Sequence, residues 1–125
     1  MVNGSDVKAV DTSKIFPKSV LAAFEKQRTS GVLKTKDPEK IPCICRIFMT
    51  FTGATWYLYD YNPKTGIAEA YCNLGNPEWA EYGFVDVWDL LSMSTGFRSL
   101  ERDRNFPTGK IMMGEIARGV KTGEW

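Results

Sequence analysis

The run Glu101-Arg102-Asp103 combines two carboxylates with a guanidinium near the end of the chain. In an extended segment alternate side chains point to opposite sides, so Glu101 and Asp103 share one side and Arg102 lies on the other. Two carboxylates can divide acid and base roles when burial separates their pKa values, and arginine binds phosphate or carboxylate through paired hydrogen bonds. The run predicts either a ligand-binding or catalytic cleft beside Trp79 and Trp88, or a structural ladder of ion pairs. Because charged runs mostly lie on solvated faces, the ladder is the favoured interpretation.

A group of tyrosines is the second candidate. Tyr57, Tyr59 and Tyr61 alternate along one predicted strand and therefore share a face. Tyr71 on the following strand and Arg46 on the preceding one can reach them. If open, such a surface would anchor a protein partner or stack bases, because tyrosine offers a large contact area at low entropic cost. If covered by helices, the same rings would stabilise the sheet through cross-strand contacts, and this interpretation is favoured.

Metal and cofactor chemistry has little support in the sequence. The 125 residues contain no histidine, which excludes Ser-His-Asp triads, Cys-His pairs and histidine-ligated zinc within this chain. The glycines match neither a phosphate-binding loop nor the dinucleotide fingerprint. One acidic set has a spacing that fits no calcium loop: Glu78, Glu81, Asp86 and Asp89. We therefore expect no metal and no cofactor.

The cellular compartment is predicted from the cysteines and from the lack of long apolar runs. Cys43, Cys45 and Cys72 are odd in number and fit no disulfide framework, so we expect buried thiols in a reducing cytoplasm. No run of about 18 apolar residues occurs, and the first residues lack the apolar segment of a signal peptide. We expect no membrane association.

The periodicity of the chain predicts an α+β fold. We expect an antiparallel sheet of about four strands, with an N-terminal helix and one or two short helices packed on it. The predicted strands cover residues 43–51, 54–61, 67–74 and 81–85. One predicted helix runs from the region of Pro17 through Gln27, and another covers 87–92. We expect residues 1–10 to be disordered, 11–117 to form a single domain and 118–125 to be a mobile tail.

The order of several motifs resembles a known family. The segments TWYLYDYNPKTG (55–66), GNPEW (75–79), EYGFVDVWDL (81–90) and LERD (100–103) are followed by Phe106. This order is similar to that of a small bacterial family catalogued as a domain of unknown function, number twenty-nine fifty-eight, whose members often lie on plasmids and other mobile elements. Asp86 stands where that family tends to have a serine helix cap. The resemblance implies a cytoplasmic accessory protein of a mobile genetic element or gene cassette, and it implies no activity.

The distribution of charge separates the remaining functions. The net charge is +1, and residues 43–92 hold two Lys or Arg against six Asp or Glu. This acidic centre disfavours nucleic-acid binding, for which Lys34, Lys36 and Lys40 would supply the phosphate contacts. The leading hypothesis is a non-catalytic binding module, with a protein partner or self-association. The alternative is a small-ligand-binding protein or an enzyme using Glu101, Arg102 and Asp103.

Overall fold

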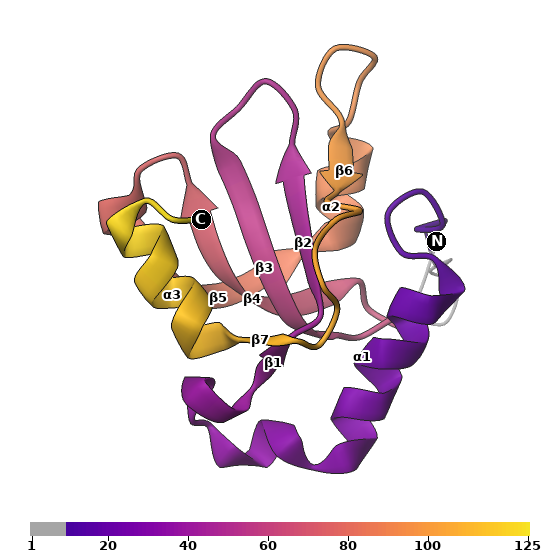
Figure 1. Ribbon diagram of the computed structural model, residues 1–125. Helices are drawn as coiled ribbons and strands as arrows, with labels where there is room; N and C mark the ends of the chain where they lie inside the picture. Colours follow the sequence, from indigo (N-terminus) through magenta and orange to yellow (C-terminus); the bar gives the residue numbers. More distant parts are fainter. Residues whose placement is uncertain (1–9) are drawn as a thin grey trace.

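The computed structural model describes residues 10–125 and shows one twisted antiparallel sheet with helices on both faces (Figure 1). The sheet has the strand order β5-β4-β3-β2-β6. Its strands are β2 (Cys45–Met49), β3 (Ala54–Tyr61), β4 (Ile67–Leu74), β5 (Glu81–Asp86) and β6 (Leu100–Arg102). A separate pair joins β1 (Pro42–Cys43) to β7 (Ile111–Met112). The predicted α+β class with an antiparallel sheet and an N-terminal helix is confirmed, and the sheet gains a fifth strand because β6 adds to the edge of β2.

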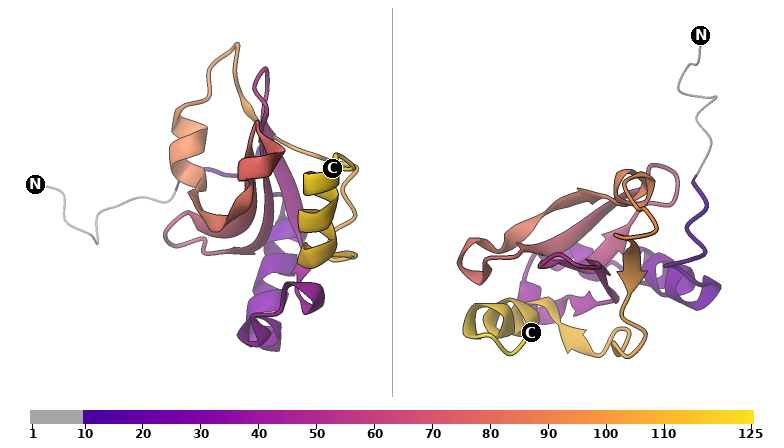
Figure 2. Two further views of the ribbon diagram at one scale, coloured as in Figure 1. Left: turned by 90° about the vertical axis from the view of Figure 1, so that its left-hand side faces the viewer. Right: turned by 90° about the horizontal axis from the view of Figure 1, so that it is seen from above.

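Six short or regular helices connect and cover these strands. The α-helices are α1 (Lys18–Ser30), α2 (Val87–Ser92) and α3 (Met113–Thr122), and the 3-10 turns are η2 (Val32–Thr35), η3 (Pro38–Lys40) and η4 (Pro77–Trp79). Helices α1 and α2 contribute to the core on one face of the sheet, and α3 contributes to the core on the other. Figure 2 shows α2 and α3 on opposite sides when the sheet is seen edge-on.

Helix α1 is fixed to the sheet by one polar side chain. It begins after Pro17, which suits the first turn because it has no N–H to leave unpaired, and it ends at Gly31 with φ 83°. Gln27 is buried, and its Nε2 donates to the backbone oxygen of Pro42 (2.9 Å) and to that of Tyr59 (2.8 Å). The amide thereby links α1 to a carbonyl of β1 and to a carbonyl of β3.

Helix α3 extends past the predicted domain boundary at residue 117. Its buried residues include Met113, Ile116 and Val120, so the apolar stripe of the helix continues three residues past that boundary. Gly123 (φ 85°) ends the helix, and the ring of Trp125 lies edge-on to Tyr57 with 6.2 Å between the ring centroids. Of the segment 118–125, Gly119 and Val120 are buried against the sheet, whereas residues 121–125 are exposed. The predicted disorder of residues 1–10 falls, except for Val10, outside the described residues.

Candidate functional site

The predicted tyrosine stripe is divided between the two cores. Tyr57 and Tyr71 are 1% and 3% exposed, because α3 covers them. A bulge between Leu58 and Asp60 shifts the register of β3, and Tyr61 consequently points into the opposite core beneath α1. The expectation that Tyr61 shares a face with the others is therefore wrong. Tyr59, the extra residue in the bulge, is the one tyrosine of β3 that stays partly exposed.

Trp88 is partly buried and is used structurally. Its Nε1 donates to the hydroxyl of Tyr61 (3.1 Å). Gly66 has φ 78°, and a Cβ at that position would lie 2.4 Å from the Trp88 ring. The turn before β4 therefore requires glycine for two reasons, its backbone conformation and the close approach of the ring. Trp88 therefore fastens α2 to the β3–β4 turn.

The run Glu101-Arg102-Asp103 forms ion pairs and hydrogen bonds at the β6 edge of the sheet. Asp103 pairs with Arg46 (3.1 Å), whose guanidinium also lies 5.1 Å from the ring centroid of Phe48. Glu101 accepts a hydrogen bond from the Ser99 hydroxyl (3.0 Å) and lies 3.8 Å from the Lys14 ammonium. Glu101 and Asp103 thus form structural ion pairs, whereas Arg102 forms none with a described residue.

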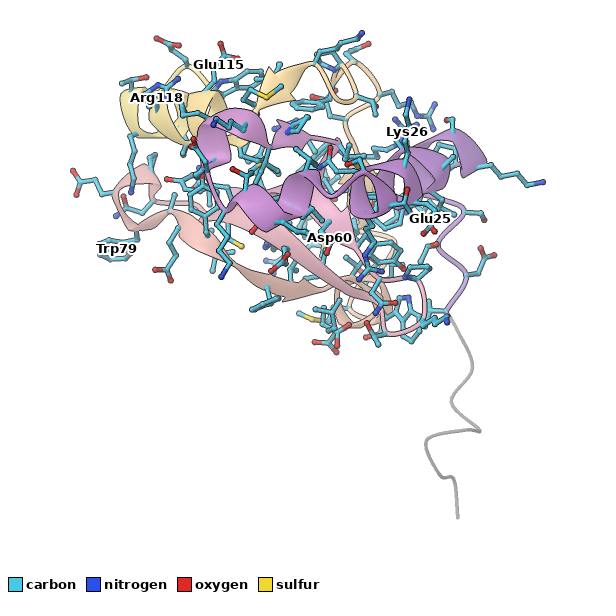
Figure 3. The ribbon with its side chains drawn as sticks, turned by 90° about the horizontal axis from the view of Figure 1, so that it is seen from below. Glu25, Lys26, Asp60, Trp79, Glu115 and Arg118 are labelled. Carbon is cyan, nitrogen blue, oxygen red and sulfur yellow. The ribbon has the colours of Figure 1, made fainter. Side chains whose placement is uncertain are left out.

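The cleft expected beside Trp79 and Trp88 is not formed. Trp79 lies in η4, before β5, at the opposite edge of the sheet from Arg102 and its neighbours in β6. Its side chain is 79% exposed and projects into solvent, as Figure 3 shows. The Arg102 Nε is buried without a hydrogen-bond partner among the described residues, but the surrounding space holds no cavity volume for a ligand.

The buried thiols of Cys43 and Cys45 lie in the two different cores of the fold. Cys43 lies in the core beneath α3, and Cys45 lies in the core beneath α1. Burial raises the pKa of both thiols, that of Cys45 to about 12, so neither is a reactive thiolate at neutral pH. Within residues 10–125 there is no group of three His, Cys, Asp or Glu side chains placed to hold a metal ion. None of the helices in that range has the length and apolar character needed to cross a membrane.

A pocket that sequence reasoning missed opens on the α3 face of the sheet. Its volume is about 360 Å³. Three neighbouring strands supply Tyr59, Glu69 and Tyr82. The connection from α1 to β1 supplies the charged Lys36 and the apolar Leu33, Pro38 and Ile41, and the start of α3 supplies Met113. Glu69 and Tyr71 are two residues apart in β4 and therefore share a face, but no pattern in the sequence indicates that residues 33–41 fold across that face.

The polar side chains of this pocket have shifted pKa values. Burial, with the nearby Asp60 charge, raises the pKa of Glu69. Burial also raises the pKa of Tyr59 and of Tyr82 to about 12, so both phenols remain neutral at physiological pH. The Tyr82 hydroxyl donates to the Met113 backbone oxygen (3.3 Å), and the rings of Tyr59 and Tyr82 lie edge to face, 6.4 Å apart. The pocket thus presents one carboxylate, two neutral phenols, the ammonium group of Lys36 and an apolar wall.

A second feature lies at one end of the sheet, where the β2–β3 turn and the loop after α2 project together (Figures 1 and 2). We define the apolar end as four exposed side chains: Phe51, Leu74, Met93 and Phe97. Phe51 and Phe97 are 76% and 67% exposed, and their rings stack with centroids 4.9 Å apart and 10° between the planes. Phe51 has φ 58°, in the left-handed region.

A groove of about 280 Å³ adjoins the apolar end. Its lining is mainly apolar: Met49, Thr52, Ala54, Trp56, Leu90, Met93 and Arg98. The surrounding sequence is unusual in carrying no charge, because residues 47–59, 70–77 and 90–97 contain no Lys, Arg, Asp or Glu. Arg98 is therefore the charged side chain that lines this groove.

Comparison with known proteins identifies a family but no function. The model of a family described as "Protein of unknown function (DUF2958)" matches residues 17–122, from the start of α1 to the end of α3. No curated protein matches the chain, and neither does any solved structure.

Proposed function

We propose that this chain, which belongs to the DUF2958 family of proteins of unknown function, is a non-catalytic protein-binding module that contacts its partner through the apolar end. The observation that carries the proposal is the conformation and exposure of Phe51. A bulky residue in the left-handed region is strained, whereas glycine or asparagine adopts it at little cost. At 76% exposure the ring also recovers little hydrophobic free energy in the free protein. Phenylalanine at position 51 therefore gains its full stabilisation only when another surface covers it.

The surroundings of Phe51 have the composition of an interface core. Interface cores are depleted in charge and enriched in aromatic residues and methionine. The apolar end combines two stacked phenylalanines with Met93 and Leu74, and the three adjacent segments are free of charge. The stacking of Phe51 on Phe97 also fixes both rings before binding, which reduces the entropic cost of ordering them.

The groove defines the chemistry of the partner. An apolar groove of about 280 Å³ accepts apolar side chains from an inserted segment. Arg98 lines this groove and makes no ion pair with another described residue. We therefore infer a segment of another protein that carries apolar side chains and a carboxylate placed to meet Arg98.

Site-specific photo-crosslinking tests this proposal. Phe97→p-benzoylphenylalanine places a crosslinker at the apolar end, and irradiation of cells followed by mass spectrometry identifies what it contacts. We expect one crosslinked protein whose yield falls at least about tenfold when Phe51→Asn or Arg98→Glu is added, because hot-spot losses exceed 1.4 kcal/mol. Lys64→Glu is the control, since Lys64 lies in the exposed turn at the other end of β3.

The pattern of crosslinks decides the outcome. A crosslinked species that persists in both variants contradicts the proposal, because it does not depend on the groove. A crosslink to a second copy of this chain contradicts it as well, since the partner is then the protein itself. The absence of any crosslink at position 97 likewise counts against it.

We further propose that the protein acts in the bacterial cytoplasm as an accessory protein of plasmids, gene cassettes or other mobile elements. The resemblance of its motifs supports this setting, and its three free cysteines fit a reducing compartment. Sequencing the DNA on both sides of the gene tests it: we expect mobility or integration genes within the same element, and a neighbourhood of chromosomal housekeeping genes would contradict it.

A further inference from the structure

The carboxylate of Glu69 forms no ion pair with a described residue, whereas the neighbouring acids are paired. Asp60, its cross-strand neighbour, lies 3.0 Å from the Nε of Arg28. Glu39, on the η3 side of the pocket, forms an ion pair with Arg118. Glu69 makes no hydrogen bond or ion pair of its own with the described residues, although it is partly buried and lines the pocket.

Aromatic side chains lie on the strands on both sides of this carboxylate. Tyr59 is on the strand to one side of Glu69, and Tyr82 is on the strand to the other. Phe84 lies directly opposite Glu69 in the β4–β5 register and is largely exposed. Aromatic faces attract cations through the ring quadrupole, most strongly where water is partly excluded. A carboxylate between aromatic rings therefore favours a positively charged ligand.

The remainder of the pocket is apolar. Leu33, Ile41 and Met113 form a wall opposite the sheet, and Met113 and Ile41 are themselves buried. The volume of about 360 Å³ is at the lower end of the range for small-molecule sites, so it suits a ligand of modest size. Such a ligand must carry an apolar body as well as its charge.

We propose that this pocket binds a small organic amine, with its ammonium group against Glu69 and the rings of Tyr59 and Tyr82. The apolar body of the amine lies against Leu33, Ile41 and Met113. The tyrosine hydroxyls stay neutral and can accept hydrogen bonds from the ammonium group. The site is separate from the apolar end, so it stands whether or not the protein-binding proposal holds.

The charge of Lys36 should affect amine binding in the opposite direction to the charge of Glu69. Lys36 is exposed and lines the same pocket, and it forms no ion pair with Glu69. A lysine ammonium near the bound amine repels it, by an amount that solvent screening keeps small. Removing the Lys36 charge should therefore strengthen amine binding, whereas removing the Glu69 charge should weaken it.

Calorimetric titration with three matched probes tests the site. Phenethylamine, phenylethanol and phenylpropionate share an aromatic body and differ in charge. At neutral pH we expect phenethylamine to bind and the other two to bind at least about tenfold more weakly, a difference of 1.4 kcal/mol. Glu69→Gln should lower the affinity for the amine about tenfold or more, and Lys36→Met should raise it about two- to fivefold.

Two control variants repeat these charge changes elsewhere. Glu81→Gln alters β5 on the opposite face of the sheet, since Glu81 pairs with Cys72, which packs beneath α1 and α2. Lys64→Met alters the exposed β3–β4 turn. Both should bind the amine as the unmodified protein does. Four results would each overturn the proposal. The first is equal binding of the neutral or anionic probe, and the second is an unchanged amine affinity of Glu69→Gln. The third is a weaker amine affinity of Lys36→Met, and the fourth is no amine binding at millimolar concentration. Lys36→Met is exposed, so its result stands even if a Glu69 variant folds poorly.

Discussion

Asp60 and Glu69 lie directly opposite each other in the β3–β4 register, yet of the two only Asp60 has a cation, the Arg28 Nε at 3.0 Å. Two carboxylates placed face to face destabilise a sheet unless one is neutralised. Arg28, in the last turn of α1, neutralises Asp60 and leaves Glu69 free to face the pocket. The same arrangement raises the pKa of Glu69, since burial and the Asp60 charge both oppose its ionisation and outweigh the opposite effect of the Arg28 charge.

Glu69→Gln should raise the melting temperature at neutral pH and have less effect in acid. Because the pKa of Glu69 is raised in the folded protein, this group contributes stability below its unfolded value near 4.5, and that contribution is lost as the pH rises through the folded pKa. Glutamine does not titrate, so the variant avoids the loss. We expect a gain on the order of 1–3 °C at pH 7.5 that shrinks towards pH 4, measured by circular dichroism.

The comparison with Glu81→Gln removes the effect of global charge. Glu81 is exposed on the other side of the sheet, so its variant should melt within about 1 °C of the unmodified protein at both pH values. A gain for Glu69→Gln that is the same at pH 4 and pH 7.5 would show that the carboxylate is not the cause.

At position 51, asparagine should give a more stable protein than alanine. Both substitutions remove the ring and its stacking on Phe97, but only asparagine tolerates φ 58° well. We expect Phe51→Asn to exceed Phe51→Ala by about 0.5–1 kcal/mol in free energy of unfolding. Urea denaturation of the two variants measures the difference, and an alanine variant of equal or higher stability would contradict the strain assigned to this turn.

Gln27→Ala should destabilise the protein far more than a surface substitution on the same helix. The side chain is buried and donates to the Pro42 and Tyr59 carbonyls, so its loss removes one hydrogen bond from each of these oxygens. We expect a cost of about 2–4 kcal/mol, because each unsatisfied buried group costs about 1–3 kcal/mol and water partly compensates. Lys26→Ala, one residue earlier on the exposed side of α1, should cost less than about 0.5 kcal/mol. Chemical denaturation of the two variants measures both values, and similar losses would contradict the role of Gln27 as a link.

Strand alternation and turn residues predicted the centre of the fold, because β3 and β4 carry a strict two-residue period between clear turns. The same reasoning failed at Tyr61, since the bulge at Tyr59 adds a residue and reverses every side chain after it. No local signal marks that bulge. Tertiary contacts with α1 contribute to the bulge, because Arg28 pairs with Asp60 and Gln27 donates to the Tyr59 carbonyl.

The candidate site was harder to predict than the fold. Glu69, Tyr82 and Lys36 are far apart in the sequence, and each has an ordinary local context. They meet because the segment from η2 to β1 folds across the α3 face, a placement that depends on tertiary packing and not on periodicity. The charges of the run Glu101-Arg102-Asp103 are contiguous and therefore visible in the sequence. The cations that pair with Glu101 and Asp103, which are Lys14 and Arg46, are distant in the sequence and meet them only in the folded chain.

Gly119 and Trp125 should show strong coupling in a double-mutant cycle. A Cβ at position 119 would lie 1.9 Å from Cδ1 of Trp125, so Gly119→Ala must displace the indole from its contacts with Tyr57 and Phe106. Alanine is otherwise the better helix former by about 0.5–1 kcal/mol. Gly119→Ala should therefore destabilise the unmodified protein by about 1–2 kcal/mol, but stabilise a Trp125→Ala background by about 0.5–1 kcal/mol. Urea denaturation of the four proteins gives the coupling energy. If Gly119→Ala has the same effect in both backgrounds, Trp125 does not occupy this site in solution, and the segment after α3 is then the mobile tail that the sequence predicted.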